Sequence, residues 1–234
     1  MIEHFVVAAS SYAKDIDGLF DLVFWIVGFW FVLAEGVFFY LIFRFKAKKG
    51  VKGEYITGEK KSEMKWISTP HYLVLACDVL IVIMAVRVWM NVKQELPVAD
   101  STVRIISQQW AWSFAHPGPD GKLDTADDIE TVDELHLEVD KTYHYRLTSR
   151  DVLRSFSVPV FRLKQDAIPG REIVGWFKPI KTGTYDIQCA EMCGIGHGLM
   201  PARVFIEDAA QHAAWVAEQS KNHIASLSAK PVAE

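Results

Sequence analysis

The chain has 234 residues, of which 50% are hydrophobic, and its formal net charge is −4 at pH 7. This length leaves room for one soluble domain of ordinary size plus membrane segments, and a mean hydropathy of +0.11 is high for a wholly soluble protein. The small net charge, and the lack of a basic block interleaved with aromatic residues in the C-terminal half, argue against a nucleic-acid partner. The chain has only 3 cysteines, which are too few for a disulfide framework.

Two hydrophobic runs predict a transmembrane hairpin. Residues 22–43 contain Glu35 as their only ionisable group, and at 1.5 Å per residue they span roughly 33 Å, enough for a bilayer. Residues 72–90 span about 28 Å, and Pro70 is expected at the helix start, where its missing N–H group costs nothing. We therefore expect membrane helices over about residues 20–45 and 70–91.

The segment between the two runs is basic. Residues 44–65 hold eight lysine or arginine residues and three glutamates, a balance of +5. Positively charged loops stay on the cytoplasmic side of a membrane. We therefore expect both termini, and everything after about residue 93, on the outer side.

Residues 98–206 have the pattern of a β-sandwich, because short runs of β-branched and aromatic residues alternate with polar, glycine and proline breaks. The expected strands cover residues 102–107, 131–139, 142–148, 171–177, 184–189 and 202–206. Alanine-rich residues 209–227 predict a C-terminal helix with Trp215 as its main apolar anchor. The chain should then divide into a hairpin over residues 1–95, a β-domain over residues 96–207, and a helix with a tail over residues 208–234.

A cluster of metal-binding residues lies between the last two expected strands. It reads Cys189-Ala-Glu191-Met-Cys193-Gly-Ile-Gly-His197-Gly-Leu-Met200 and is called the cassette below. Soft thiolate and thioether ligands select copper over hard cations, and an imidazole suits copper in either oxidation state. The cassette therefore predicts a copper site for electron transfer, on a loop held by a rigid scaffold.

Several motifs, in this order along the chain, resemble subunit II of the haem-copper oxidases. They are Trp66 followed by Pro70, Gln109-Trp110-Ala-Trp112-Ser-Phe114, Asp151-Val-Leu-Arg154-Ser155, Lys164-Gln-Asp166-Ala-Ile-Pro169-Gly170-Arg171, and the cassette. The resemblance implies a two-helix transmembrane hairpin and an all-β, cupredoxin-like Greek-key sandwich, in a bacterial-type inner membrane with the copper domain on the periplasmic side. It also implies partnership with subunit I and the other subunits of such a complex.

The function that the resemblance implies is electron transfer within a respiratory enzyme. Such a subunit accepts electrons from cytochrome c at a binuclear copper centre called CuA and passes them to haem in subunit I, where oxygen reduction is coupled to proton translocation. The catalytic haem site is on another chain. Two alternatives stay open: a copper-deficient structural subunit of a quinol oxidase, and the copper subunit of a related nitric-oxide reductase.

The resemblance also assigns roles within the cassette. Cys189 and Cys193 would bridge two coppers, and His197 and Met200 would be terminal ligands. Glu191 would ligate copper through its backbone carbonyl, and its carboxylate would contact a magnesium ion at the interface with subunit I.

Arg154 departs from the family pattern, because it stands where the family has a ligand histidine. A guanidinium group has no free lone pair and does not deprotonate in proteins, so it cannot replace the imidazole as a ligand. Three outcomes stay open. The site could hold two coppers with water, a backbone group or another histidine in the vacant position; it could hold one copper through thiolate, His197 and Met200; or the loop could be copper-free, with a Cys189–Cys193 disulfide.

Three further positions have expected roles. By the resemblance, Trp110 is the surface residue through which electrons arrive, and Glu63 is the carboxylate at the entrance of a proton-uptake channel. The insert Asp120–Asp128 resembles an acidic calcium loop, although its spacing does not fit the EF-hand and a solvated turn is the simpler reading.

Overall fold

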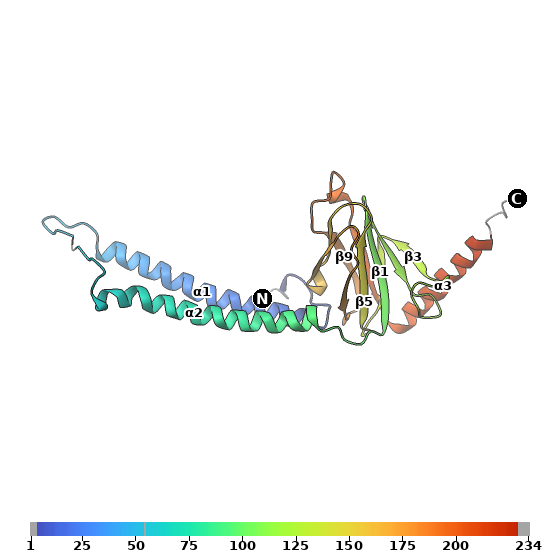
Figure 1. Ribbon diagram of the computed structural model, residues 1–234, viewed down its shortest axis with the longest axis horizontal. Helices are drawn as coiled ribbons and strands as arrows, with labels where there is room; N and C mark the ends of the chain where they lie inside the picture. The colour runs from blue at the N-terminus through green and yellow to red at the C-terminus, as the bar shows by residue number, and fades with distance from the viewer. Residues whose placement is uncertain (1–3, 54, 229–234) are drawn as a thin grey trace. The chain divides into compact units, whose positions relative to one another are not determined.

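The computed structural model describes residues 4–53 and 55–228 (Figure 1). The chain forms two compact units. Residues 17–90 make the helical unit, and the residues up to 16 together with those from 91 onward make the second unit, called the β-unit below.

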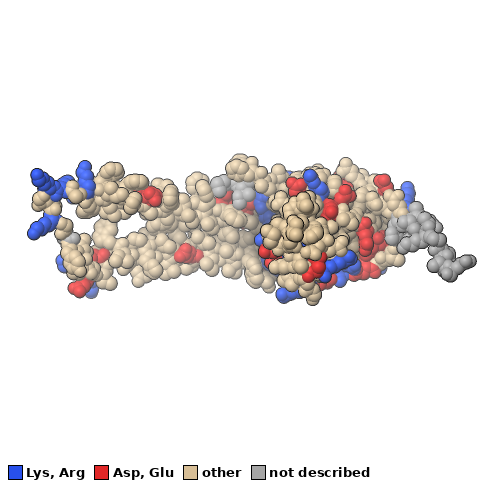
Figure 2. Space-filling model, turned by 90° about the horizontal axis from the view of Figure 1, so that it is seen from above, with Lys and Arg blue, Asp and Glu red and all other residues tan. Residues whose placement is uncertain are grey.

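The helical unit contains two long helices, α1 (Ala13–Arg44) and α2 (Lys61–Trp89), and α2 continues into a π-helical turn over Met90–Gln94. Both helices are long and apolar enough to cross a membrane, and their apolar stretches are not buried by other parts of the described chain. Figure 2 shows basic side chains gathered at the loop end of this unit, while the helix surfaces carry almost no charge. The two expected long apolar helices are therefore present.

The start of α2 differs from the prediction. Pro70 does not begin the helix but lies inside it, because α2 already starts at Lys61. The first turn is stabilised by Glu63, whose carboxylate accepts a hydrogen bond from the Gly58 N–H (3.0 Å) and lies 3.7 Å from the Lys60 ammonium. Proline is common at a helix start but also tolerated within membrane-spanning helices, so its position alone gave the wrong boundary.

The β-unit is a sandwich of two five-stranded sheets. One sheet has the order β3-β2-β1-β5-β8 and the other β4-β10-β9-β6-β7. In chain order the strands are β1 (Ser101–Gln108), β2 (Ala111–His116), β3 (Ile129–Val132), β4 (Glu134–Glu138), β5 (Tyr143–Ser149), β6 (Arg154–Val158), β7 (Leu163–Ala167), β8 (Ile173–Phe177), β9 (Gly183–Cys189) and β10 (Ala202–Glu207). The pairs β1–β5 and β4–β10 are parallel, and the others are antiparallel. This confirms the expected sandwich.

Aromatic side chains fill the core between the two sheets. Phe156 on β6 meets Trp112 and Phe114 on β2 edge to face, with ring centroids 5.3 and 6.3 Å apart. All three rings are buried. Such pairs are worth about 0.5–1.5 kcal/mol beyond the area they bury, so they fix β6 of one sheet against β2 of the other.

The expected strand over residues 131–139 is wrong as a single strand. Asp133 has a φ of 59°, which breaks the extended backbone, and the chain passes from β3 in one sheet to β4 in the other. The Asp133 carboxylate accepts a hydrogen bond from the Trp112 N–H (2.8 Å), and aspartate tolerates this conformation better than most residues. β6 and β7 were not predicted, because Arg154 and the polar run Lys164-Gln165-Asp166 hide their alternation.

Residues before α1 pack onto the sandwich. The Ala9 N–H donates to the Val160 carbonyl (2.8 Å), and the Ile180 N–H donates to the Ala9 carbonyl (2.9 Å). Tyr12 meets Trp176 edge to face, with centroids 5.1 Å apart. The N-terminal segment is thus part of the β-unit.

The C-terminal helix α3 (Ala209–Ser228) is present as expected. Trp215 stacks on His136, with ring centroids 4.1 Å apart, and meets His116 edge to face. His136 and His212 both contact the Glu207 carboxylate through Nδ1, at 2.8 and 3.0 Å. Trp215 therefore anchors the start of α3 on the sandwich, as predicted.

Candidate metal centre

The cassette forms the loop from the end of β9 to the start of β10, with a short 3₁₀ turn at His197–Leu199. Backbone pairing sets its first residue, because Cys189 lies opposite Phe156 of β6 and the Ala190 N–H donates to the Ser155 carbonyl (2.9 Å). The indole N–H of Trp112 donates to the Met200 carbonyl at the other end (3.3 Å). The loop is therefore anchored to the core at both ends.

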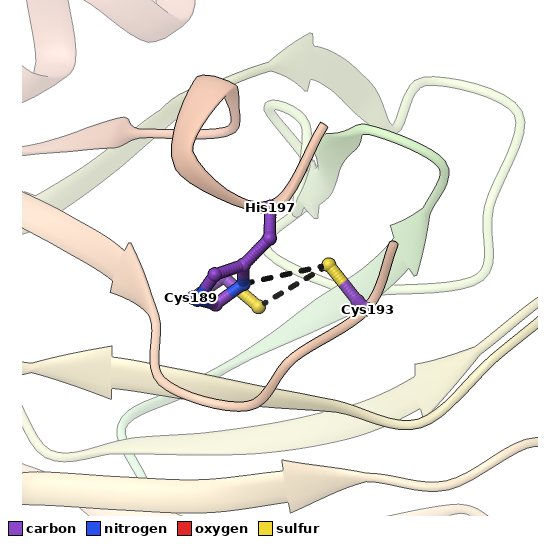
Figure 3. Close-up of side chains that lie close together, drawn as sticks. All are labelled: Cys189, Cys193 and His197. Carbon is purple, nitrogen blue, oxygen red and sulfur yellow. Dashed lines mark hydrogen bonds between the residues drawn. The ribbon is translucent and has the colours of Figure 1, made fainter. Parts of the chain in front are cut away.

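The loop brings its sulfur and nitrogen donors together (Figure 3). The ligand atoms of Cys189, Cys193 and His197 all lie within 4.8 Å of one another. The Cys193 sulfur is 3.7 Å from the Cys189 sulfur, 3.7 Å from His197 Nδ1 and 3.4 Å from the Met200 sulfur. The Cys189 thiol donates to the Glu191 carbonyl (3.2 Å). All five residues expected to bind copper are thus close together, and both cysteines are free thiols.

The centre of the cluster is shielded from solvent. Cys193 and Met200 are buried, while Cys189 and His197 are half-buried. Burial and the neighbouring Cys189 raise the pKa of the Cys193 thiol, and the nearby guanidinium of Arg154 opposes this increase. A bound metal ion would displace the thiol protons, because only thiolates ligate metals well.

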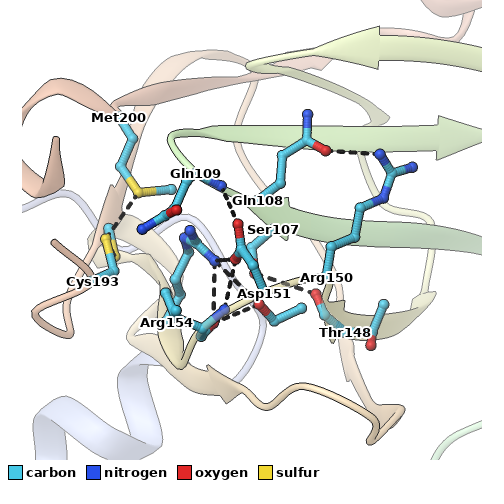
Figure 4. Close-up of polar contacts among 12 residues, drawn as sticks. Ser107, Gln108, Gln109, Thr148, Arg150, Asp151, Arg154, Cys193 and Met200 are labelled. Carbon is cyan, nitrogen blue, oxygen red and sulfur yellow. Dashed lines mark hydrogen bonds and ion pairs between the residues drawn. The ribbon is translucent and has the colours of Figure 1, made fainter.

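Arg154 is the first residue of β6 and is fully buried. Its Nη1 pairs with the Asp151 carboxylate and donates to Ser149 Oγ (3.2 Å) and the Val152 carbonyl (3.1 Å) (Figure 4). Its Nε and Nη2 are buried, and neither has a hydrogen-bond partner of good geometry in the described part of the chain. One side of the guanidinium is therefore satisfied and the other is not.

Asp151 connects Arg154 with the turn that carries Trp110. Its carboxylate accepts hydrogen bonds from the Gln109 N–H and the Val152 N–H, both at 2.7 Å. Partial burial would raise the pKa of Asp151, but the hydrogen bonds from Arg154, Val152 and Gln109 outweigh it and the pKa is lowered. Asp151 therefore stays ionised and holds the guanidinium in place.

The residues present fit copper, but they do not supply the whole CuA ligand set. Two thiols, an imidazole, a thioether and a carbonyl are donors that copper accepts. A second imidazole is lacking, since His197 is the only histidine in the metal-binding cluster found within residues 4–53 and 55–228. His144, on β5, contacts the Pro97 carbonyl instead (2.8 Å).

Trp110 lies in the turn between β1 and β2, and its side chain packs on the cassette. A Cβ atom added to Gly196 would lie 2.3 Å from Trp110 Cδ2, and one added to Gly194 would lie 3.4 Å from Trp110 Nε1. The indole is therefore in van der Waals contact with the loop backbone. The Trp110 side chain is also 40% exposed, so the ring extends from solvent to the cassette.

Sequence reasoning missed the residues that support this arrangement. Asp151 begins the Asp151–Ser155 motif, but its contact with Gln109 joins positions far apart in the chain. Gly196 is buried under the indole of Trp110. The closely spaced glycines of the cassette were the one feature of the sequence that could have indicated such a close contact.

The other expected sites lie elsewhere. Glu63 belongs to the helical unit. In the acidic insert, Asp124 pairs with Arg104 and with Arg146 (2.6 Å), and Asp127 accepts a hydrogen bond from the Thr125 hydroxyl (2.7 Å). The insert forms no cluster of three ligands in the described part of the chain, so calcium binding there stays a prediction. Magnesium at Glu191 also stays a prediction.

Comparisons with known proteins give one family. A family model described as cytochrome c oxidase subunit II, periplasmic domain, matches residues 101–207. The alternative cytochrome c oxidase subunit 2 of Bradyrhizobium diazoefficiens is 34% identical over 226 residues, which cover 87% of this chain and 80% of that protein. The cytochrome c oxidase subunit 2 of Cereibacter sphaeroides is 28% identical over 94% of this chain and 81% of its own length. The crystal structure of the periplasmic domain of subunit II of cytochrome oxidase from Bradyrhizobium japonicum has a TM-score of 0.49 and 33% identity, covering 55% of this chain and 99% of that one.

Proposed function

We propose that this chain, which belongs to the family of cytochrome c oxidase subunit II, is the subunit through which electrons enter a haem-copper oxidase. As a member of this family it is part of an oxidoreductase complex whose catalytic haem lies on another chain. The proposed donor is cytochrome c, and the proposed acceptor is haem in subunit I, with oxygen reduction and proton translocation following there.

The observation that carries the proposal is the contact between the indole of Trp110 and a loop that gathers two thiols, an imidazole and a thioether. A copper ion held by these donors supplies a one-electron redox couple. The part of the protein is to hold the donors in one arrangement, through the β6–β9 pairing and the Trp112 hydrogen bond, and to present a conjugated ring to solvent directly against them. This arrangement suits electron transfer rather than a structural role alone.

The exposed surface of the cassette itself suits a docked donor. Met192, Ile195 and Leu199 are apolar and are 74%, 98% and 81% exposed. Adjacent exposed apolar side chains mark interaction sites more often than scattered ones do. We propose that this apolar rim and Trp110 receive the donor.

The membrane arrangement is also proposed. The basic loop between α1 and α2 favours the cytoplasmic side for that loop, which would put both termini and the metal-binding unit on the periplasmic side of an inner membrane. In that orientation Glu63, at the loop end of α2, would stand at the cytoplasmic face, as the proposed entrance of a proton channel requires. The Glu191 carboxylate is the proposed magnesium contact towards subunit I.

The proposal is tested in the assembled complex, in membranes of a strain that carries Cys193→Ser as its only copy. We expect the complex to assemble but to lose oxidation of reduced cytochrome c, measured by absorbance. Trp110→Ala should slow the same reaction without loss of copper, and Trp110→Phe should slow it less because an aromatic ring remains. If the Cys193→Ser complex oxidises cytochrome c at the wild-type rate, or if the wild-type complex oxidises quinol but not cytochrome c, a structural subunit without copper is favoured instead.

A further inference from the structure

We infer that the cassette holds a single copper ion and that the guanidinium of Arg154 occupies the place of a second one. The inference rests on the proposed function for the identity of the metal, and it goes beyond that function by assigning the stoichiometry and the role of Arg154. It follows from the geometry of the donors, from the charges and from the unpaired side of the guanidinium.

The donor spacing allows one ion to contact all four side chains. Two ligands that each lie about 2.0–2.3 Å from the same ion can be no more than about 4.6 Å apart. The Cys193 sulfur is 3.7, 3.7 and 3.4 Å from the donor atoms of Cys189, His197 and Met200. These four side chains, with the Glu191 carbonyl beside Cys189, already make a complete site for one copper.

Arg154 itself supplies no ligand for a second copper. The family pattern has a neutral imidazole there, which offers a lone pair, whereas a guanidinium offers five N–H donors and no acceptor. The Arg154 side chain is fully buried and is held by Asp151, Ser149 and Val152, so it cannot swing out to make room without breaking an ion pair and two hydrogen bonds. A cation at this position repels a metal ion.

A one-copper site beside Arg154 has the same net charge as a two-copper site of the family pattern. A site of the family pattern has two thiolates, two cuprous ions and neutral imidazoles, so the thiolate charge is just balanced. Removing one cuprous ion together with its imidazole, and inserting one guanidinium, leaves the net charge unchanged. The Asp151 carboxylate that pairs with Arg154 belongs to the same motif in the family pattern, so it does not alter this comparison. Keeping both coppers beside Arg154 would therefore add one positive charge to a buried site, where like charges repel more strongly than in water.

The unpaired side of Arg154 has a natural partner in such a site. Nε and Nη2 are buried and lack acceptors among the described residues, which is unfavourable for a charged group. A metal-bound Cys193 thiolate would accept hydrogen bonds from these N–H groups, in the way that thiolate ligands are usually supported.

The test is the copper content and spin of the full-length chain, purified in detergent, reduced, loaded with excess copper and desalted. We expect one copper per chain by metal analysis. Electron paramagnetic resonance of the oxidised protein should show hyperfine splitting from one copper nucleus. These two measurements need no variant, so they decide the inference even where a variant fails to fold.

Two variants test whether the residue at position 154 sets the number of coppers. Arg154→His restores the imidazole, and we expect two coppers per chain and an unpaired electron shared between both nuclei. Arg154→Lys keeps the positive charge, and we expect one copper, as in the wild type. Circular dichroism checks that each variant is folded.

The outcomes distinguish this inference from the proposed function. Two coppers with a shared electron in the wild type would overturn the inference and leave the proposed function standing. A wild-type chain that binds no copper would overturn both. One copper in a folded Arg154→His variant would show that Arg154 is not what excludes the second ion.

Discussion

The contact between Trp110 and the cassette gives a sharp steric prediction for Gly196→Ala. The new methyl carbon would lie 2.3 Å from Trp110 Cδ2, whereas carbon atoms in contact are about 3.5–4.0 Å apart. One of the two groups must therefore move by more than about 1 Å. Gly196 has a φ of −84°, which alanine adopts readily, so the effect comes from the overlap and not from backbone strain.

Overpacking of this kind costs about 1–3 kcal/mol, and each kcal/mol lowers the melting temperature of a unit of this size by roughly 2–4 °C. Gly198→Ala is the matched control, because nothing lies within 4 Å of a Cβ atom there. We expect thermal unfolding by near-ultraviolet circular dichroism to show destabilisation for Gly196→Ala only, together with a shifted tryptophan fluorescence and slower oxidation of the donor. Equal melting temperatures and spectra for the two variants would refute the packing of the indole on the loop.

Three further perturbations test other parts of the β-unit. Asp151→Asn removes the charge partner of buried Arg154. Because Asp151 is partly exposed, we expect the free energy of unfolding in urea to fall by about 2 kcal/mol, less than the usual 3–5 kcal/mol for a buried pair. Wild-type stability would contradict the ion pair. Burial lowers the pKa of His116 from its ordinary 6.5 to about 3. As the pH falls below 6.5, His116 is therefore protonated in the unfolded chain before it is protonated in the folded one. The free energy of unfolding should then fall by up to about 1.4 kcal/mol per pH unit between pH 6.5 and pH 3. His116→Gln should flatten this dependence, and an unchanged slope would assign it to other groups. Trp215→Ala removes the stacking on His136 and should lower the free energy of unfolding by about 1 kcal/mol. Hydrogen exchange at the start of α3 should become several-fold faster. Unchanged protection would mean that Trp215 does not anchor the helix.

The local features of the site could be predicted from the sequence, and the non-local ones could not. The cassette donors lie within one short loop, so their spacing alone indicated a metal cluster. The contact of Trp110 with Gly196, and the position of Arg154 on the strand that pairs with the strand of Cys189, depend on how β1, β2, β6 and β9 pair, which no local pattern reveals. That Arg154 cannot ligate follows from its chemistry, but that it is buried and half-paired required the structure.

The same distinction applies to the fold. The long apolar helices and most strands were predictable, because hydrophobic runs and alternation are local signals. The break at Asp133 was hidden, because its left-handed backbone is stabilised by the Trp112 N–H on another strand. The Pro70 position misled because a proline compatible with a helix start is also compatible with a helix interior in an apolar segment.

The pairing of Ala9 with Val160 and Ile180 constrains how this polypeptide is threaded and assembled. The stretch ahead of α1 finds its hydrogen-bond partners only after the ribosome has synthesised most of the remaining chain. In any bilayer that α1 and α2 both cross, that stretch must lie on the same face as the sandwich, because two crossings return the polypeptide to the face from which it started. Retention of that stretch on the opposite face would leave its backbone groups and Tyr12 without their partners, so correct insertion of α1 is required for the sandwich to complete its packing.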